Sequence, residues 1–288
     1  MIRIRGQEKA RTPVFQCLVL QKVMPQKFVS VRRIAAVFAA MVAVIVTVAG
    51  CSSDDGSSGG NSSGGKTTLN VYAAASLKST FTELAKAFEK AHSDVEVKLN
   101  FAGSSALVTQ INQGADADVI ATADERTMQK LGDKAVDPKI FATNTLTIVT
   151  APGNPKRITG FASLRDSGAK TVVCAPEVPC GAATVAVEKN TGVELTPVSQ
   201  EASVTAVLTK VTSGEADAGL VYVTDAKSAG DKVATVGDAA FAQVVNKYPI
   251  ATVKGTKHSE QAEQFKDMVL GQTGQEILSA AGFASAGS

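Results

Sequence analysis

Short apolar runs and amphipathic stretches alternate along the chain from residue 67 onward. Residues 69–73 (LNVYA) combine apolar, β-branched and aromatic side chains, a pattern typical of a buried strand. Directly afterwards, apolar residues recur at helical spacing on one face: Leu77, Phe81, Leu84 and Phe88. The alternation predicts an α/β fold in which a helix follows most strands.

The same order repeats to the end of the chain. Further strands are predicted at residues 95–101, 118–121, 144–150, 171–174, 218–223 and 247–254. Further helices are predicted at residues 106–113, 125–131, 182–189, 204–211, 259–270 and 274–281. We expect two doubly wound α/β lobes, residues 67–146 plus 248–288 and residues 147–247. Two strands, 144–150 and 247–254, should cross between them.

Small residues and hydroxyls stand at four of the strand-to-helix turns. These turns lie at Ser76, at Ser104, at Cys180-Gly181 and at Ala202–Val204. Ser76 occupies the place of a helix N-cap. If the lobes face each other, all four helix N-termini point into one cleft, each with unpaired N–H groups and a partial positive charge. The sequence therefore predicts a site for a small oxyanion.

The N-terminal region has the features of an export signal. Arg32-Arg33 precede the apolar run 34–50, which is slightly short for a membrane-spanning helix. Val48-Ala49-Gly50-Cys51 resembles the signal box of bacterial lipoproteins. We therefore expect residues 1–50 to be a signal peptide, with Met24 as an alternative start, and Cys51 to carry lipid that anchors the protein outside the cell membrane. Residues 51–66, rich in Ser and Gly, should form a flexible linker.

Composition excludes several classes of partner. The formal net charge is +2, which gives no reason to expect a nucleic-acid partner. Aromatic residues make up 5% and Trp is absent, so a stacking platform for bases or sugars is not expected. Residues 60–67 (GNSSGGKT) fit the phosphate-loop pattern, but a linker precedes them and a strand follows. No nucleotide or other cofactor is expected.

The acidic residues and histidines do not form a catalytic or metal-binding pattern. Asp116, Asp118 and Asp124 lack the spacing of a calcium loop, so helix capping and surface solvation are expected instead. His92 and His258, the two histidines, stand at polar helix ends. The chain has no G-x-S-x-G element, so a serine hydrolase, the main rival class, is not favoured. We expect a protein that is not an enzyme.

Five short motifs occur in order between residues 69 and 283. They are Ala73-Ala74-Ala75-Ser76, Phe101-Ala102-Gly103-Ser104-Ser105, Ala115-Asp116-Ala117-Asp118-Val119, Pro176-Glu177-Val178-Pro179 and Gly219-Leu220-Val221-Tyr222. Together they resemble the molybdate-binding component of bacterial ABC importers. The resemblance implies a type II periplasmic-binding-protein fold and a monomer that binds molybdate or tungstate and serves a permease and its ATPase. Molybdenum would be present only as the bound oxyanion.

The resemblance also implies a set of ligand-binding residues. Hydroxyls would come from Ser76, Ser104 and Tyr222, and backbone N–H groups from Ser76, Ser104, Cys180 and Val204. Cys180 stands where the family commonly has Ala, a change that a backbone donor tolerates. The set contains donors and no carboxylate, which suits a fully deprotonated dianion better than phosphate, which carries a proton near pH 7. Receptors for sulfate, phosphate or an iron chelate remain alternatives. An effector-binding module of a transcription regulator is not favoured, because the lipoprotein signal predicts an exported, anchored protein that cannot regulate transcription.

Two cysteines flank the Pro176–Pro179 segment. An extracytoplasmic location permits disulfides, Cys51 is expected to carry lipid and Cys17 is expected to be removed. We therefore expect Cys174 and Cys180 to form a disulfide that stiffens the loop carrying the Cys180 N–H, with two free thiols as the alternative.

Overall fold

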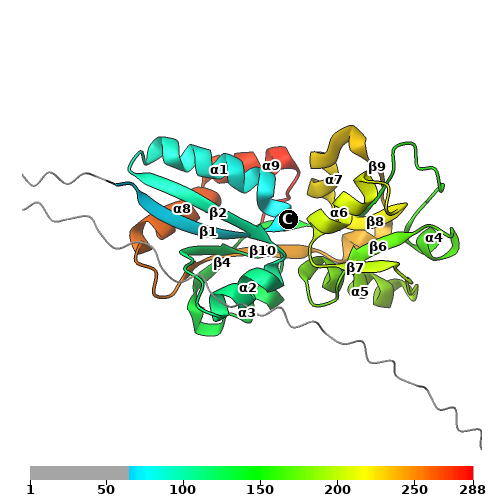
Figure 1. The fold of residues 1–288 in the computed structure, drawn as a ribbon, viewed down its shortest axis with the longest axis horizontal. Helices are drawn as coiled ribbons and strands as arrows, with labels where there is room; N and C mark the ends of the chain where they lie inside the picture. The colour runs from blue at the N-terminus through cyan, green and yellow to red at the C-terminus, as the bar shows by residue number, and fades with distance from the viewer. Residues whose placement is uncertain (1–64, 288) are drawn as a thin grey trace, which may run out of the picture. The chain divides into compact units, whose positions relative to one another are not determined.

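The computed structural model describes residues 65–287, which belong to one compact unit, Gly60–Ser288. Two five-stranded sheets organise these residues, in the orders β2-β1-β3-β10-β4 and β7-β6-β8-β5-β9. We call the first sheet with its helices the first lobe and the second sheet with its helices the second lobe (Figure 1). The predicted α/β class is confirmed. The predictions for residues 1–50, for Cys51 and for most of the 51–66 linker concern residues outside the described range.

The first lobe contains the two ends of the described chain. Its strands are β1 (Thr67–Ala74), β2 (Val95–Ala102), β3 (Val119–Ala121), β4 (Ala135–Asn144) and β10 (Asn246–Val253). Its helices are α1 (Lys78–Ala91), α2 (Ser104–Asn112), α3 (Glu125–Gln129), α8 (Ser259–Leu270) and α9 (Gln272–Ala281), with 3₁₀ turns η1 (Ala75–Leu77) and η2 (Gly132–Lys134). Since β1 follows directly on Lys66, no helix follows the GNSSGGKT segment, which contradicts a phosphate loop there.

Helices cover both faces of this sheet. Helices α1 and α9 lie on one side, and α2 and α3 lie together on the other (Figure 1). Strand β3 shows the pattern: Val119 and Ala121 belong to the main core, whereas Ile120 belongs to a smaller cluster with Leu107 of α2 and Met128 of α3. Successive side chains of a strand point to opposite faces, so a strand covered on both sides is apolar throughout.

The second lobe lies between the two crossings. Its strands are β5 (Leu146–Thr150), β6 (Thr171–Cys174), β7 (Ser199–Glu201), β8 (Ala218–Tyr222) and β9 (Ala234–Val236). Its helices are α4 (Phe161–Asp166), α5 (Pro179–Thr191), α6 (Val204–Thr212) and α7 (Val223–Ala229), with 3₁₀ turns η3 (Gly230–Lys232) and η4 (Ala239–Gln243).

The crossings occur slightly earlier in the chain than the expected boundaries. Leu146 already pairs with Tyr222 in the second sheet, and Asn246 already pairs with Asn144 in the first. The segment 144–150, expected as one strand, is divided between the end of β4 and the whole of β5. Two neighbouring crossing segments thus connect the lobes, and polar residues stand in both of them.

Candidate functional site

A cavity lies where four helix-starting turns meet between the lobes. About 220 Å³ there is free of protein atoms, open solvent at its mouth included. Its walls come from the starts of η1, α2, α5 and α6, together with the end of β8. All five residues predicted to bind the ligand are among those that line it: Ser76, Ser104, Cys180, Val204 and Tyr222. The four turns predicted from the sequence therefore do converge.

Two glycines allow the backbone to approach closely around this cavity. A Cβ on Gly103 would lie 2.1 Å from the carbonyl oxygen of Ala202, on the opposite lobe. A Cβ on Gly181 would lie 1.9 Å from the carbonyl oxygen of Ala175, which precedes its own helix. Gly103 therefore lets the two lobes touch, and Gly181 lets the start of α5 fold back onto β6.

Ser76 does not cap a helix as expected. It lies inside the 3₁₀ turn η1, whose N-cap is Ala74, and the following helix α1 has Leu77 at its N-cap position without a side-chain cap. The Ser76 side chain is buried, and its Oγ lies 3.1 Å from the Oη of Tyr248. Since the Ser76 hydroxyl does not cap η1 or α1, it is available to the cavity that Ser76 lines.

Ser104 begins α2 and is almost completely buried. Its Oγ accepts a hydrogen bond of 3.0 Å from the backbone N–H of Ala123. The neighbouring Ser105 donates its hydroxyl across the lobes to the carbonyl of Glu177 at 2.6 Å. One serine thus faces the cavity and the other holds the lobes together.

Tyr222 reaches the cavity from the end of β8. Its side chain is buried, and its Oη accepts from the Nδ2 of Asn246 at 3.0 Å. Burial raises the pKa of Tyr222 well above its ordinary value, so the phenol keeps its hydrogen at neutral pH. Tyr222 lines the cavity, and its hydroxyl has a partner, Asn246, that comes from a crossing segment.

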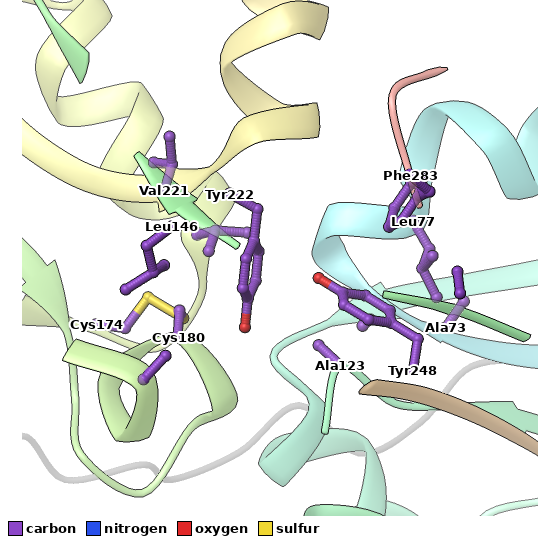
Figure 2. Packing of buried hydrophobic residues seen from close by; sticks show 14 of the residues in the cluster. Ala73, Leu77, Ala123, Leu146, Cys174, Cys180, Val221, Tyr222, Tyr248 and Phe283 are labelled. Atoms are coloured by element: carbon purple, nitrogen blue, oxygen red, sulfur yellow. A yellow bond between two sulfur atoms is a disulfide. The ribbon is translucent and has the colours of Figure 1, made fainter. Parts of the chain in front are cut away.

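The loop between β6 and α5 contains a disulfide. Cys174 and Cys180 are joined with a Cα–Cα distance of 5.6 Å. The bond lies on the second-lobe side of the cavity, near Tyr222 (Figure 2). Because Cys180 stands in the first turn of α5, the bond ties the start of that helix to the end of β6.

Sequence reasoning missed a set of polar residues behind the cavity wall. Tyr248 points its hydroxyl towards Tyr222 from the opposite lobe (Figure 2), and burial raises its pKa as well. Asn144 and Asn246 stand in the crossing segments, and both are buried. The sequence did contain a signal for them: asparagines within strongly β-forming crossing segments. A buried amide needs hydrogen-bond partners, so such a residue indicates a polar network nearby.

The acidic residues differ partly from expectation. Asp124 caps α3 by accepting from the N–H of Thr127 at 2.8 Å, as predicted. Asp118 is not solvated: it is 1% exposed and accepts from the N–H of Asn70 and from the hydroxyl of Thr256. Its carboxylate thus takes the place of a backbone carbonyl as the acceptor for a strand N–H in the core. The prediction of a solvated surface residue was therefore wrong for Asp118.

The electrostatic character of the cavity comes from dipoles. None of the described residues that line it is Lys, Arg, His, Asp or Glu. Across residues 65–287, no group of three or more His, Cys, Asp or Glu is placed to hold a metal ion. In the same range, no helix has both the length and the apolar character needed to cross a bilayer. Helix N-termini and hydroxyls are therefore the donors that this cavity offers an anion.

Comparisons with known proteins agree with this geometry. The chain is 51% identical over 217 residues to the molybdate-binding protein ModA of Mycobacterium tuberculosis, covering 74% of this chain and 83% of that protein. The structure resembles the periplasmic molybdate-binding protein of Azotobacter vinelandii, with a TM-score of 0.63, 22% identity and coverage of 75% and 98%. It also resembles the sulfate-binding protein SubI of M. tuberculosis, with a TM-score of 0.66, 19% identity and coverage of 76% and 87%.

The two structural resemblances show the fold alone, because both identities are low. The family described as bacterial extracellular solute-binding protein matches residues 69–284, which span both lobes and the whole cavity. The chain belongs to the bacterial extracellular solute-binding protein family.

Proposed function

We propose that the protein captures molybdate, and also tungstate, in the interlobe cavity for delivery to an ABC importer. The single observation that carries this proposal is the cavity wall, which brings the three predicted hydroxyl residues together with four helix-starting turns and contains no charged side chain. The relative named as a molybdate-binding protein, 51% identical, supports the choice of ligand. The hydroxyls belong to Ser76, Ser104 and Tyr222, and the backbone donors to Ser76, Ser104, Cys180 and Val204.

Hydrogen-bond counting supports binding by neutral donors. Molybdate is a tetrahedral dianion whose oxygens only accept, so every contact with the wall needs a donor from the protein. A hydrogen bond to a charged group contributes about 1.5–3 kcal/mol. A handful of such bonds is enough to reach the roughly −8 kcal/mol of micromolar binding.

Sulfate is the alternative ligand with a specific observation behind it. The chain shares its fold with a sulfate-binding protein, but at 19% identity. Sulfate has the same charge and shorter bonds, so a rigid cage sized for molybdate leaves its donors stretched around sulfate. Phosphate is disfavoured because its proton needs an acceptor, and the described cavity wall has no carboxylate.

Binding should be coupled to a rotation of the lobes. The lobes in this proposal are the first and second lobes defined by the two sheets, with the two crossing segments as hinges. Ser76 and Ser104 come from one lobe, whereas Tyr222, Cys180 and Val204 come from the other. Closure is favoured when one dianion satisfies both sets of donors at once.

The test is calorimetry with a panel of oxyanions. The parent protein should bind molybdate and tungstate and should bind sulfate more weakly by orders of magnitude. Ser104→Ala or Tyr222→Phe should lose about 1–3 kcal/mol of molybdate affinity with the fold intact. If both variants bind molybdate as tightly as the parent, or if the parent binds sulfate equally well, the assignment is wrong.

The cellular setting completes the proposal. The protein acts as a monomeric, non-enzymatic receptor without a resident cofactor, and its partners are a permease, the ATPase of that permease and the cell membrane. Lipid on Cys51 holds it there after the preceding residues are removed. Mass spectrometry of the native protein should find Cys51 as the modified first residue. A Cys51→Ser form that is still lipid-modified and membrane-bound would contradict the anchor.

A further inference from the structure

We propose that the Cys174–Cys180 disulfide positions the segment 175–180 for oxyanion binding, so that reduction of this bond lowers the affinity of the protein for the ion. The inference rests on the proposed function and concerns the control of the same site. Stiffening of the loop is expected from the sequence alone. The structure adds two observations: the segment forms part of the cavity wall, and the opposite lobe binds its carbonyl groups.

The C-terminal half of this segment lines the cavity. Val178, Pro179 and Cys180 are consecutive and buried, and all three are part of the cavity wall. Cys180 is the second residue of α5, so its N–H has no partner within the helix and is free to bind an anion. The disulfide holds this N–H in place directly, because it ties the side chain of the same residue to the end of β6.

The N-terminal half of the segment contacts the other lobe. The carbonyl of Glu177 accepts from the Ser105 hydroxyl at 2.6 Å, and the carbonyl of Pro176 accepts from the Arg126 guanidinium at 3.3 Å. Ser105 belongs to α2 and Arg126 to α3, both in the first lobe. Both acceptors lie within the ring of residues that the disulfide closes. One short loop therefore carries a cavity wall and a contact between the lobes.

The main chain also holds this loop, and the disulfide adds to that restraint. The N–H of Ala175 donates to the carbonyl of Glu201 at 2.9 Å, and the N–H of Val178 donates to the carbonyl of Ala175 at 3.0 Å. A cross-link reduces the number of conformations that the loop adopts while no ion is bound. Once the bond is broken, closure around the ion has to order more conformations, and the free energy of ordering is subtracted from binding.

Reduction and ion binding should oppose each other. A dithiol reductant delivers two electrons and two protons: the disulfide becomes two thiols, and the reductant becomes a disulfide. Its thiolate must first reach a sulfur atom, but Cys174 is 1% exposed and Cys180 is 4% exposed, so the loop has to move. A bound ion resists this movement because it holds the Cys180 N–H and favours closed lobes. Such coupling is reciprocal by thermodynamic necessity.

The first measurement is calorimetry with molybdate. The oxidised mature protein is compared with protein that was reduced by a dithiol and then freed of it without oxygen, so that no dithiol competes for the ion. The dissociation constant of the reduced protein should be at least about tenfold larger, equal to about 1.4 kcal/mol. The control is the double variant Cys174→Ala with Cys180→Ala, which keeps the backbone N–H. It should bind as weakly as the reduced protein and should not respond to the dithiol treatment.

The second measurement separates positioning from a purely structural role. The reduction potential of the bond is determined in dithiol–disulfide buffers, with free thiols trapped by alkylation and counted by mass spectrometry. If the oxidised form binds molybdate at least about tenfold more tightly, saturating molybdate should make the potential at least about 30 mV more negative, since two electrons are transferred. A bond that only stabilises the fold, without coupling to the site, keeps the same potential with and without molybdate.

The outcomes separate this inference from the function on which it rests. An oxidised protein that binds neither molybdate nor tungstate overturns the proposed function together with the inference. An oxidised protein that binds molybdate, with equal affinity in the reduced protein and the double variant, overturns the inference alone, and so does a potential that molybdate leaves unchanged. A double variant that circular dichroism shows to be unfolded assigns the bond to folding and likewise overturns the inference alone.

Discussion

Replacing Asp225 by Asn should remove a large part of the pH dependence of folding stability. Asp225 stands in the first turn of α7, is 8% exposed, and accepts from the backbone N–H of Tyr222 at 3.0 Å. Burial raises the pKa of its carboxyl group from 3.8 to about 7, although the hydrogen bond from Tyr222 opposes the shift. The amide oxygen of Asn can accept the same hydrogen bond without the charge.

The size and sign of the effect follow from the two pKa values. The folded protein keeps a proton on Asp225 up to about pH 7, whereas the unfolded chain releases it near pH 3.8. Between these values the folded state binds more protons, so stability falls as the pH rises through this window. Above it, the buried carboxylate costs about 4 kcal/mol relative to an ordinary one.

The assay is guanidinium unfolding of the parent and of Asp225→Asn, monitored by circular dichroism at about pH 5 and about pH 8. The stability of the variant relative to the parent should increase by about 2–3 kcal/mol between the two conditions. Asp238→Asn, which also replaces a carboxylate that caps a helical turn, is measured in parallel. A parent–variant difference that is equal at both pH values would refute the reasoning.

Two further predictions concern the cavity walls. Gly103→Ala should push the lobes apart at Ala202 and weaken molybdate binding, measured by calorimetry, at least about tenfold. Gly237→Ala is the control, because its new Cβ meets no atom within 4 Å, and it should leave binding unchanged. Equal molybdate affinities of Gly103→Ala and the parent would contradict the close contact. Thiol titration of the unfolded, unreduced mature protein should find no free thiol, because Cys174 and Cys180 are bonded, and two reactive thiols would exclude the disulfide.

The sequence predicted the residues that lie on strand-to-helix turns. Ser76 and Ser104 follow apolar strands, and a parallel sheet brings such strand ends together whatever the details of packing. Tyr222 ends a strand, β8, and only the family resemblance implied its role. The helix at Ser259–Leu270 was predicted with its observed bounds, because its amphipathic pattern is long and regular. Such patterns are set by residues close together in the sequence, so the sequence alone is enough to recognise them.

Residues that depend on distant partners were not predicted. Strand β4 was missed because Asp137 and Pro138 interrupt its pattern; Asp137 has a φ of 45°, and β4 is tolerated as the edge strand of its sheet. Asn246 acts on Ala123 and Tyr222 across a large sequence separation. Nothing in its local pattern indicates which groups the fold will bring to its amide.

The contacts between the lobes should determine how long a bound ion stays in the cavity. Ser105 donates to the carbonyl of Glu177 at 2.6 Å, and Arg126 donates to the carbonyl of Pro176 at 3.3 Å, both across the lobes and near the cavity. An ion held inside can leave quickly only when such contacts part, so the rate of opening limits the rate of release. A substitution that removes one of these two hydrogen bonds should shorten the residence time of the ion far more than it slows capture. Affinity differences among variants of one site come mostly from the dissociation rate constant.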